Sequence, residues 1–405
     1  MVVINLPIKK IMLQKSLDDL KAQCLTCSRH CIINNLHWGF CRTRFNLFGE
    51  IYNNNYGIIS SISNNPIEKK PFFHFYPGSY ALTIGGFSCN FSCSWCQNYD
   101  ISTKIPKISK SSFKIFIKDL KNKKNENTIF NYEFYDFNEI LKTLNQNQTK
   151  GLDLKQKKVI DLDDYYTNYY CITPNELIDY CNKNKTIIQG TSVSFNEPTL
   201  SLEYSLDLFK IAHENGFYNT YISNGYMSQE ALDLLIKSNL DALKIDIKGP
   251  PEIYEKIMPN ADWKIPWQNA NYALKNKIHV EIVCLLVSDI CDNEEFIDFV
   301  IENHLKYLDE NVPLHFTRYF PAYNFHNEPT NLEFLKMARK RAINAGIKFV
   351  YSGNIFHDDS ENTYCPNCNS LLIERKLYDI RIAGLKKIEN KSFCVNCGSD
   401  IPILI

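Results

Sequence analysis

Residues 85–98 read GGFSCNFSCSWCQN and place three cysteines, Cys89, Cys93 and Cys96, in the spacing C-x-x-x-C-x-x-C. Three thiolates on one short loop can bind three irons of a [4Fe–4S] cubane. A fourth cysteine at similar reach is missing, so one iron keeps an open position, which is typical of a catalytic metal site. A ferredoxin-like electron-transfer cluster, or a zinc ion that borrows a distant ligand, is the alternative interpretation.

The sequence around this loop predicts an α/β fold. Between residues 80 and 354, short apolar runs alternate with amphipathic stretches, a pattern typical of βα units around a parallel sheet. Strands are expected at residues 81–85, 191–195, 219–223, 242–247, 279–286 and 314–320, with an extra strand at 349–352. Helices are expected at residues 202–215, 228–238, 294–308 and 332–345. Six such units predict a partial (βα)6 barrel of the triosephosphate-isomerase type, with the site in the loops that follow the strands.

Composition gives little information about partners. The chain has 405 residues, 44% of them hydrophobic, and 45 basic residues balance 45 acidic ones. The resulting net charge of zero does not indicate nucleic acid or an anionic membrane as a partner. We find neither a secretory signal in residues 1–15 nor an apolar run of about 20 residues that would span a membrane. A cytoplasmic protein with reduced cysteines is therefore expected.

The chain divides into three predicted parts. An N-terminal metal-binding region covers residues 1–78, the barrel covers 79–355, and a C-terminal module covers 356–405. Residues 104–170 interrupt the barrel with a stretch that is rich in lysine, asparagine and tyrosine. We interpret this stretch as a low-complexity insertion that is partly disordered.

The N-terminal region contains four closely spaced cysteines, Cys24, Cys27, Cys31 and Cys41. Four thiolates suit a tetrahedral zinc ion. An auxiliary iron–sulfur cluster uses the same type of ligand, and spacing does not separate the two. Of these alternatives we favour zinc.

The C-terminal module contains two C-x-x-C pairs, formed by Cys365 with Cys368 and by Cys394 with Cys397. Each pair makes a turn that can aim two sulfurs at one metal ion. The pairs are further apart than in most zinc ribbons but have the same form. We expect a structural zinc ion here.

A series of motifs resembles one known family. In chain order they are PIEKKPFFHFYPGS (66–79), the cysteine loop with Trp95 before its third cysteine, SFNEP (194–198), SNG (223–225), DIKG (246–249), HVEIVCLLV (279–287), PLHFTRYFPAY (313–323) and TYCPNC (363–368). They are similar to the radical S-adenosylmethionine (SAM) superfamily and, within it, to the radical SAM protein of the AmmeMemoRadiSam system. That group is similar to pyruvate formate-lyase activating enzymes. The resemblance covers most of the chain outside the insertion.

The resemblance implies a reaction. In that superfamily SAM binds the open iron, an electron from the reduced cluster cleaves the sulfonium bond, and a 5′-deoxyadenosyl radical abstracts hydrogen from a substrate. The expected substrate is a protein, as in glycyl-radical activation, or a small molecule. The resemblance also implies oxygen sensitivity, an electron donor such as ferredoxin or flavodoxin, and partners that resemble Memo and the AMMECR family.

The resemblance also assigns SAM contacts. Asn196 and Glu197 take the place where the superfamily contacts the methionyl amine. Asn224, Asp246 and Lys248 follow the third and fourth predicted strands, where a carboxylate can bind ribose hydroxyls and a lysine the methionyl carboxylate. Strand alternation places Asp246 and Lys248 on one face, where a plain ion pair is the alternative.

Four further residues complete the predicted site. Phe91 and Trp95 are candidates to flank the adenine, although core packing explains an aromatic side chain equally well. His315 and Arg318 follow the sixth strand and are expected to face the substrate.

Two other classes of function are consistent with the sequence. In the first, the barrel and its metal modules act as a scaffold or an electron carrier within a complex. In the second, the protein is a radical enzyme that modifies RNA and binds it through the zinc modules and the lysine-rich insertion. The neutral charge balance argues against nucleic acid as a partner.

Overall fold

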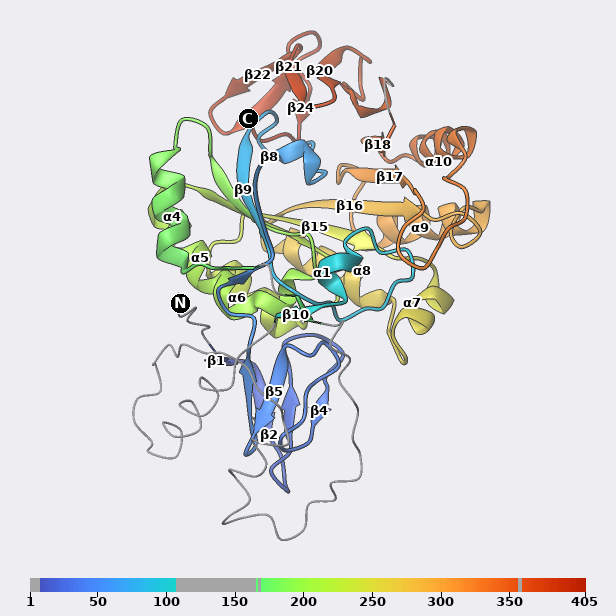
Figure 1. Cartoon of the computed structure of the whole chain (residues 1–405). Coiled ribbons are helices and arrows are strands. Elements are labelled where there is room, and N and C mark those ends of the chain that lie inside the picture. The colour runs from blue at the N-terminus through green and yellow to red at the C-terminus, as the bar shows by residue number, and fades with distance from the viewer. Residues whose placement is uncertain (1–7, 107–164, 167–168, 356–358) are drawn as a thin grey trace.

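The computed structural model describes residues 8–106, 165–166, 169–355 and 359–405. The insertion predicted at residues 104–170 therefore lies mostly outside the described residues. In Figure 1 an N-terminal subdomain of short strands lies below the central sheet and a C-terminal module lies above it. In the described part of the chain, every helix is too short or too polar to cross a membrane.

An eight-stranded sheet forms the centre of the protein, in the order β18-β17-β16-β15-β14-β13-β9-β8. The strands from β9 to β18 run parallel, and β8 pairs with β9 antiparallel at the edge. The strands are β8 (Ser61–Pro66), β9 (Tyr80–Gly85), β13 (Gly190–Val193), β14 (Tyr218–Ser223), β15 (Ala242–Ile247), β16 (His279–Leu286), β17 (Leu314–Arg318) and β18 (Val350–Gly353). The predicted partial barrel of parallel strands is confirmed, including its extra strand.

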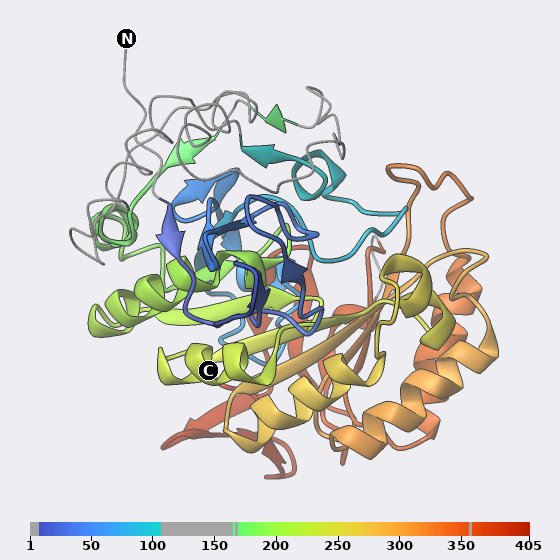
Figure 2. The same cartoon turned by 90° about the horizontal axis from the view of Figure 1, so that it is seen from below.

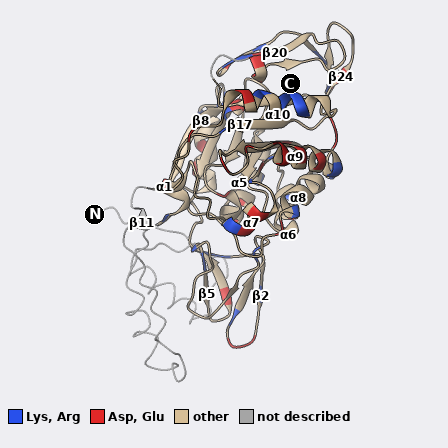
Figure 3. Ribbon diagram, turned by 90° about the vertical axis from the view of Figure 1, so that its right-hand side faces the viewer, with Lys and Arg blue, Asp and Glu red and all other residues tan. Residues whose placement is uncertain are grey.

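Helices connect the parallel strands and cover one face of the sheet (Figure 2). The helices are α1 (Tyr99–Ser102), α4 (Pro174–Lys183), α5 (Leu202–Glu214), α6 (Gln229–Lys237), α7 (Pro251–Ile257), α8 (Lys264–Lys275), α9 (Glu294–Tyr307) and α10 (Leu332–Asn344). Side-chain caps fix where several of them begin, such as Ser228 before α6 and Asn293 before α9. Acidic and basic residues are intermixed along the helices in Figure 3, in keeping with the zero net charge.

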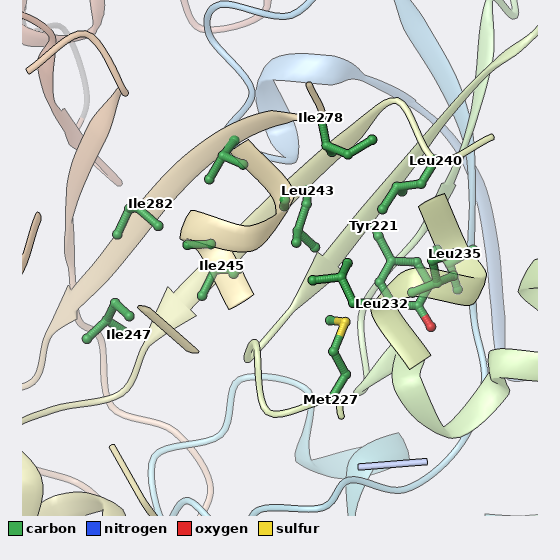
Figure 4. Packing of buried hydrophobic residues seen from close by; sticks show 14 of the residues in the cluster. Tyr221, Met227, Leu232, Leu235, Leu240, Leu243, Ile245, Ile247, Ile278 and Ile282 are labelled. Carbon is green, nitrogen blue, oxygen red and sulfur yellow. The ribbon is translucent and has the colours of Figure 1, made fainter. Parts of the chain in front are cut away.

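Strand β15 shows how the sequence separates the core from the site. Its residues Leu243, Ile245 and Ile247 are buried in one hydrophobic cluster with α6 residues such as Leu232 (Figure 4). Burying such a side chain stabilises the fold by about 1.5–3 kcal/mol. Because side chains alternate along a strand, the intervening polar residues lie on the opposite face, inside the barrel.

The N-terminal subdomain consists of two small antiparallel sheets in the orders β1-β6-β5 and β2-β3-β4. Its strands are β1 (Lys9–Lys10), β2 (Gln14–Ser16), β3 (Ala22–Cys24), β4 (Ile32–Ile33), β5 (Arg44–Leu47) and β6 (Glu50–Asn53). A buried ion pair joins Arg44 to Glu203 of α5 at 3.3 Å. In addition, the backbone N–H of Ser28 donates to the carbonyl of Tyr226 at 3.1 Å. The subdomain is thus docked near the loop that follows β14.

The C-terminal module also has two three-stranded sheets, β19-β20-β21 and β22-β23-β24. Its strands are β19 (Thr363–Tyr364), β20 (Leu371–Lys376), β21 (Asp379–Ile382), β22 (Leu385–Ile388), β23 (Lys391–Cys394) and β24 (Asp400–Ile401). The buried guanidinium of Arg375 donates to the carbonyl of Phe73 at 2.7 Å, and the N–H of Leu404 donates to the carbonyl of His74 at 2.9 Å. These contacts attach the module to the segment between β8 and β9.

Candidate active site

The cysteine loop lies at the C-terminal edge of the parallel strands. It begins directly after β9 and is hydrogen-bonded to segments that follow other strands. The side chain of Asn98 donates to the carbonyl of Phe195 beyond β13 at 2.7 Å, and that of Gln97 donates to the carbonyl of Phe320 beyond β17 at 2.9 Å. This edge is where barrel enzymes carry their sites.

The thiols of this loop have the chemistry and the spacing that a cubane cluster requires. Cys89, Cys93 and Cys96 are partly buried. Burial raises the pKa of Cys93 to about 12 and also raises that of Cys89, so binding a metal there would release protons. Their sulfurs do not all lie within 4.8 Å of one another, as ligands of one ion would. Three thiolates on one loop that do not converge on a single ion can bind three separate irons of a [4Fe–4S] cluster.

Asn196 holds the start of the cysteine loop. Its side-chain oxygen accepts from the N–H of Gly86 at 2.9 Å, and its nitrogen donates to the carbonyls of Phe87 at 3.0 Å and Ser88 at 3.1 Å. The side chain of Asn196 is buried, and all three of these hydrogen bonds are made to the protein backbone. Its predicted contact with the methionyl amine remains a prediction, while its positioning of the loop is a role that the sequence did not suggest.

Glu197 ties together the segments that follow β13 and β14. Its Oε1 accepts from the hydroxyl of Thr199 at 2.6 Å and from that of Ser223 at 2.7 Å, and its Oε2 accepts from the N–H of Asn224 at 2.9 Å. Burial raises the pKa of this carboxyl, although these donors oppose the shift. From the described residues Oε2 accepts one hydrogen bond, so it has a lone pair left for a further donor.

Asn224 lies beside the first cluster cysteine. Its side-chain nitrogen donates to Oδ1 of Asn90 at 2.7 Å and lies 3.9 Å from Sγ of Cys89. Its oxygen accepts from the N–H of Tyr226 at 3.0 Å. Asn224 therefore lies beside the cluster loop, and its predicted contact with SAM remains a prediction.

A line of three charged side chains extends along β15 toward the cysteine loop. Asp246 pairs with Lys244 and, at 3.2 Å, with Lys248. Burial alone would raise the pKa of Asp246, but the two lysines outweigh it and hold that pKa below its usual range. Burial would lower the pKa of Lys248, but Asp246 and the thiols of Cys93 and Cys89 outweigh it, so this pKa is raised. Lys248 is therefore a cation next to the cysteine loop.

Lys244 is the member of this group that the sequence reasoning missed. Its side chain is only 6% exposed, whereas those of Asp246 and Lys248 are 28% and 24% exposed. The strand alternation that paired Asp246 with Lys248 places Lys244 on the same face, so the signal was present in the sequence.

The two predicted aromatic residues surround the cysteines with apolar surface. Phe91 packs against Tyr226 and Tyr254, with ring centroids 5.2 and 5.9 Å apart, and Trp95 packs against Phe325 at 6.3 Å. Both belong to a cluster that also contacts Cys89 and Cys93. They cover part of the loop with apolar surface, and an adenine contact remains a prediction.

His315 does not occupy the position predicted for it. It is 2% exposed, and its Nε2 lies 2.6 Å from Oε2 of the buried Glu281. Oε1 of Glu281 accepts from the backbone N–H groups of Phe73 and His74. This network anchors the segment that holds the C-terminal module, which argues against a substrate contact by His315. Arg318 ends β17 and donates to the carbonyl of Thr330, and its substrate role remains a prediction.

The cysteines of the C-terminal module converge as ligands of a single ion do. Sγ of Cys365 lies 3.6 Å from that of Cys397, and Sγ of Cys368 lies 3.7 Å from that of Cys394. Tetrahedral zinc with four thiolates separates its sulfurs by about 3.8 Å. The four cysteines of the predicted C-terminal metal module are thus close enough together to bind one metal ion.

Comparisons with known proteins identify the family of the chain. A family model described as the Radical SAM superfamily matches residues 161–300, which contain β13 to β16 and most of the polar residues described above. This chain belongs to the radical SAM superfamily. The radical SAM chain is also 34% identical over 398 residues to a protein of Methanocaldococcus jannaschii described as uncharacterized protein MJ0808, covering 98% of this chain and all of the relative.

Solved structures resemble parts of this chain at low identity. A domain of pyruvate-formate lyase-activating enzyme from Bacteroides vulgatus is 17% identical, covers 41% of this chain and 99% of its own, and gives a TM-score of 0.35. A radical SAM methyltransferase from Sphaerobacter thermophilus is 10% identical, covers 86% of this chain and 77% of its own, and gives a TM-score of 0.41. At these scores neither likeness bears on the substrate.

Proposed function

We propose that Cys89, Cys93 and Cys96 hold a [4Fe–4S] cluster, and that the protein uses it with SAM to abstract hydrogen from a substrate at the mouth of the barrel. When bound, the cluster and SAM supply a 5′-deoxyadenosyl radical by one-electron cleavage of the sulfonium bond. The observation that carries the proposal is the loop of three partly buried thiols at the C-terminal edge of the parallel strands, beside Lys248.

The surrounding residues have distinct roles in this proposal. Lys248 binds the methionyl carboxylate, and Asp246 binds ribose hydroxyls while it keeps the lysines paired. Glu197 accepts a hydrogen bond from the methionyl amine through its remaining lone pair. Phe91 and Trp95 exclude water from the radical's surroundings.

The proposed substrate is a protein, as in glycyl-radical activation, or a small molecule. We further propose a cytoplasmic, oxygen-sensitive enzyme that receives electrons from a ferredoxin or flavodoxin and works with Memo-like and AMMECR-like partners. Zinc in the C-terminal module is part of the same proposal. The resemblance to the AmmeMemoRadiSam radical SAM protein supports these assignments.

The test is anaerobic reconstitution with iron and sulfide, reduction in the presence of SAM, and quantification of 5′-deoxyadenosine and methionine. Wild type should form both products. Cys93→Ala should form neither, because the cluster loses one of its three ligands. Cys171→Ala is the matched control, since Cys171 lies on β12 (Tyr170–Cys171), paired with β7 (Ile58–Ile59), and should leave product formation unchanged. A well-loaded wild type that never cleaves SAM would favour the scaffold function instead.

A further inference from the structure

Cys24, Cys27, Cys31 and Cys41 line one cavity, together with Asn90 and Arg44. Four thiolates around one cavity can bind a single zinc ion or bridge the irons of a cubane, so the atoms around the sulfurs must decide between the two.

The distances between the sulfurs support a larger group. Among the described residues, only the C-terminal cysteines bring three or more ligand atoms within 4.8 Å of one another. The N-terminal cysteines do not, and in this respect they match the cysteine loop of the barrel. Thiolates that bind four different irons of a cubane lie further apart than thiolates on one zinc ion.

The lining of the cavity offers hydrogen bonds that suit an iron–sulfur cluster. The hydroxyl of Thr26 lies 3.6 Å from Sγ of Cys24, and that of Thr43 lies 3.3 Å from Sγ of Cys41. Asn90 is 1% exposed, and its side-chain nitrogen has no hydrogen-bond partner among the described residues. A buried N–H without a partner is unfavourable, and a cluster sulfide in the cavity would be an acceptor for it.

The cavity adjoins the cysteine loop of the barrel. The hydroxyl of Ser88 donates to the carbonyl of Cys41 at 2.6 Å, and Ser88 precedes Cys89 in the chain. Asn90 follows Cys89 and lines the cavity. Both residues that flank the first cluster cysteine are therefore in contact with the N-terminal site.

We propose that Cys24, Cys27, Cys31 and Cys41 bind an auxiliary [4Fe–4S] cluster, in place of the zinc ion favoured in the sequence analysis, and that it passes electrons to the cluster at Cys89. In that step the reduced auxiliary cluster loses one electron and the cluster of the barrel gains it, with no proton transferred. A low-potential one-electron donor such as dithionite or reduced flavodoxin supplies the electron. The transfer role rests on the proposed radical function, whereas the metal content does not.

Metal analysis tests the site without any assay of activity. After anaerobic reconstitution, the triple variant Cys89→Ala, Cys93→Ala, Cys96→Ala should keep about four irons and four sulfides per chain, and wild type about eight of each. Adding Cys24→Ala and Cys31→Ala to the triple variant should remove its iron and sulfide. A triple variant that contains two zinc ions and no sulfide would overturn the proposal. If the variants do not fold, wild type with only about four irons would overturn it equally.

Electron paramagnetic resonance tests the transfer path. Fully reduced wild type should show spectra broadened by coupling between two nearby clusters, and this broadening should be absent from Cys93→Ala and from Cys31→Ala. A wild-type spectrum equal to the sum of the two single-site spectra would contradict the path. This readout is independent of SAM cleavage, so its failure is distinguishable from failure of the proposed enzyme activity.

Discussion

At the scale of single residues, Asp246 compensates the charge of two lysines inside the barrel. Within the part of the chain that the structure describes, Asp246→Asn removes the one carboxylate paired with the buried Lys244. An uncompensated buried charge costs about 3–5 kcal/mol, so we expect the free energy of unfolding in urea to fall by about 3 kcal/mol. Glu310→Gln is the control, because Glu310 pairs with Lys348 at the exposed surface and should change stability by less than about 1 kcal/mol. Equal losses in the two variants would contradict the assigned role.

His74 makes stability depend on pH. Its Nδ1–H donates to the carbonyl of Pro402 and its Nε2 accepts from the hydroxyl of Tyr351, and burial lowers its pKa to about 3. The unfolded imidazole titrates near 6.5, so below that pH the unfolded state binds a proton that the folded state does not. Stability should therefore fall with decreasing pH, by about 1.4 kcal/mol per unit from this group. In His74→Gln, the free energy of unfolding should change with pH between pH 6 and 4.5 less steeply than in wild type, by that amount. An unchanged pH dependence would refute the assignment of His74 as a buried neutral imidazole.

At the scale of elements, the loop between β9 and α1 depends on Asn196 for its shape. Asn196→Ala removes three hydrogen bonds to residues 86–88 and leaves backbone groups unpaired. We expect the variant to load less iron on reconstitution and to lose it faster in the presence of a chelator. Asn276→Ala, at the exposed C-terminal end of α8, is the matched control and should retain iron as wild type does. Equal rates of iron loss in all three proteins would show that Asn196 does not position the loop.

The elements that the sequence predicted well are those with clear periodicity. Strand β15 is an example, because its alternating pattern decides both the buried face and the charged face. Strand β8 was not predicted, because its sequence SISNNP carries one apolar residue before its proline and pairs only at the edge of the sheet. The role of Asn196 also escaped prediction, since its partners are backbone groups whose positions depend on the fold. Cysteine spacing likewise does not encode the distances between sulfurs, which is why the metal in the N-terminal site stayed open.

At the scale of the whole molecule, the N-terminal and C-terminal metal modules lie on opposite sides of the barrel (Figure 1). Loss of the metal from one module should therefore leave the other module intact. Cys394→Ser removes one ligand from the C-terminal set, and we expect loss of one zinc ion per chain by mass spectrometry and a lower melting temperature. The iron content of the barrel should not change. Val395→Ser, an exposed neighbour, is the control and should keep the zinc. Loss of iron together with zinc in Cys394→Ser would show that the modules are coupled.

The most direct test of the central claim is electron–nuclear double resonance on the reduced protein with SAM labelled with ¹⁵N at the methionyl amine. If Cys89, Cys93 and Cys96 leave one iron open, the label should show hyperfine coupling to the cluster in wild type and none in Cys93→Ala. Absence of coupling in wild type with a fully loaded cluster would contradict the account.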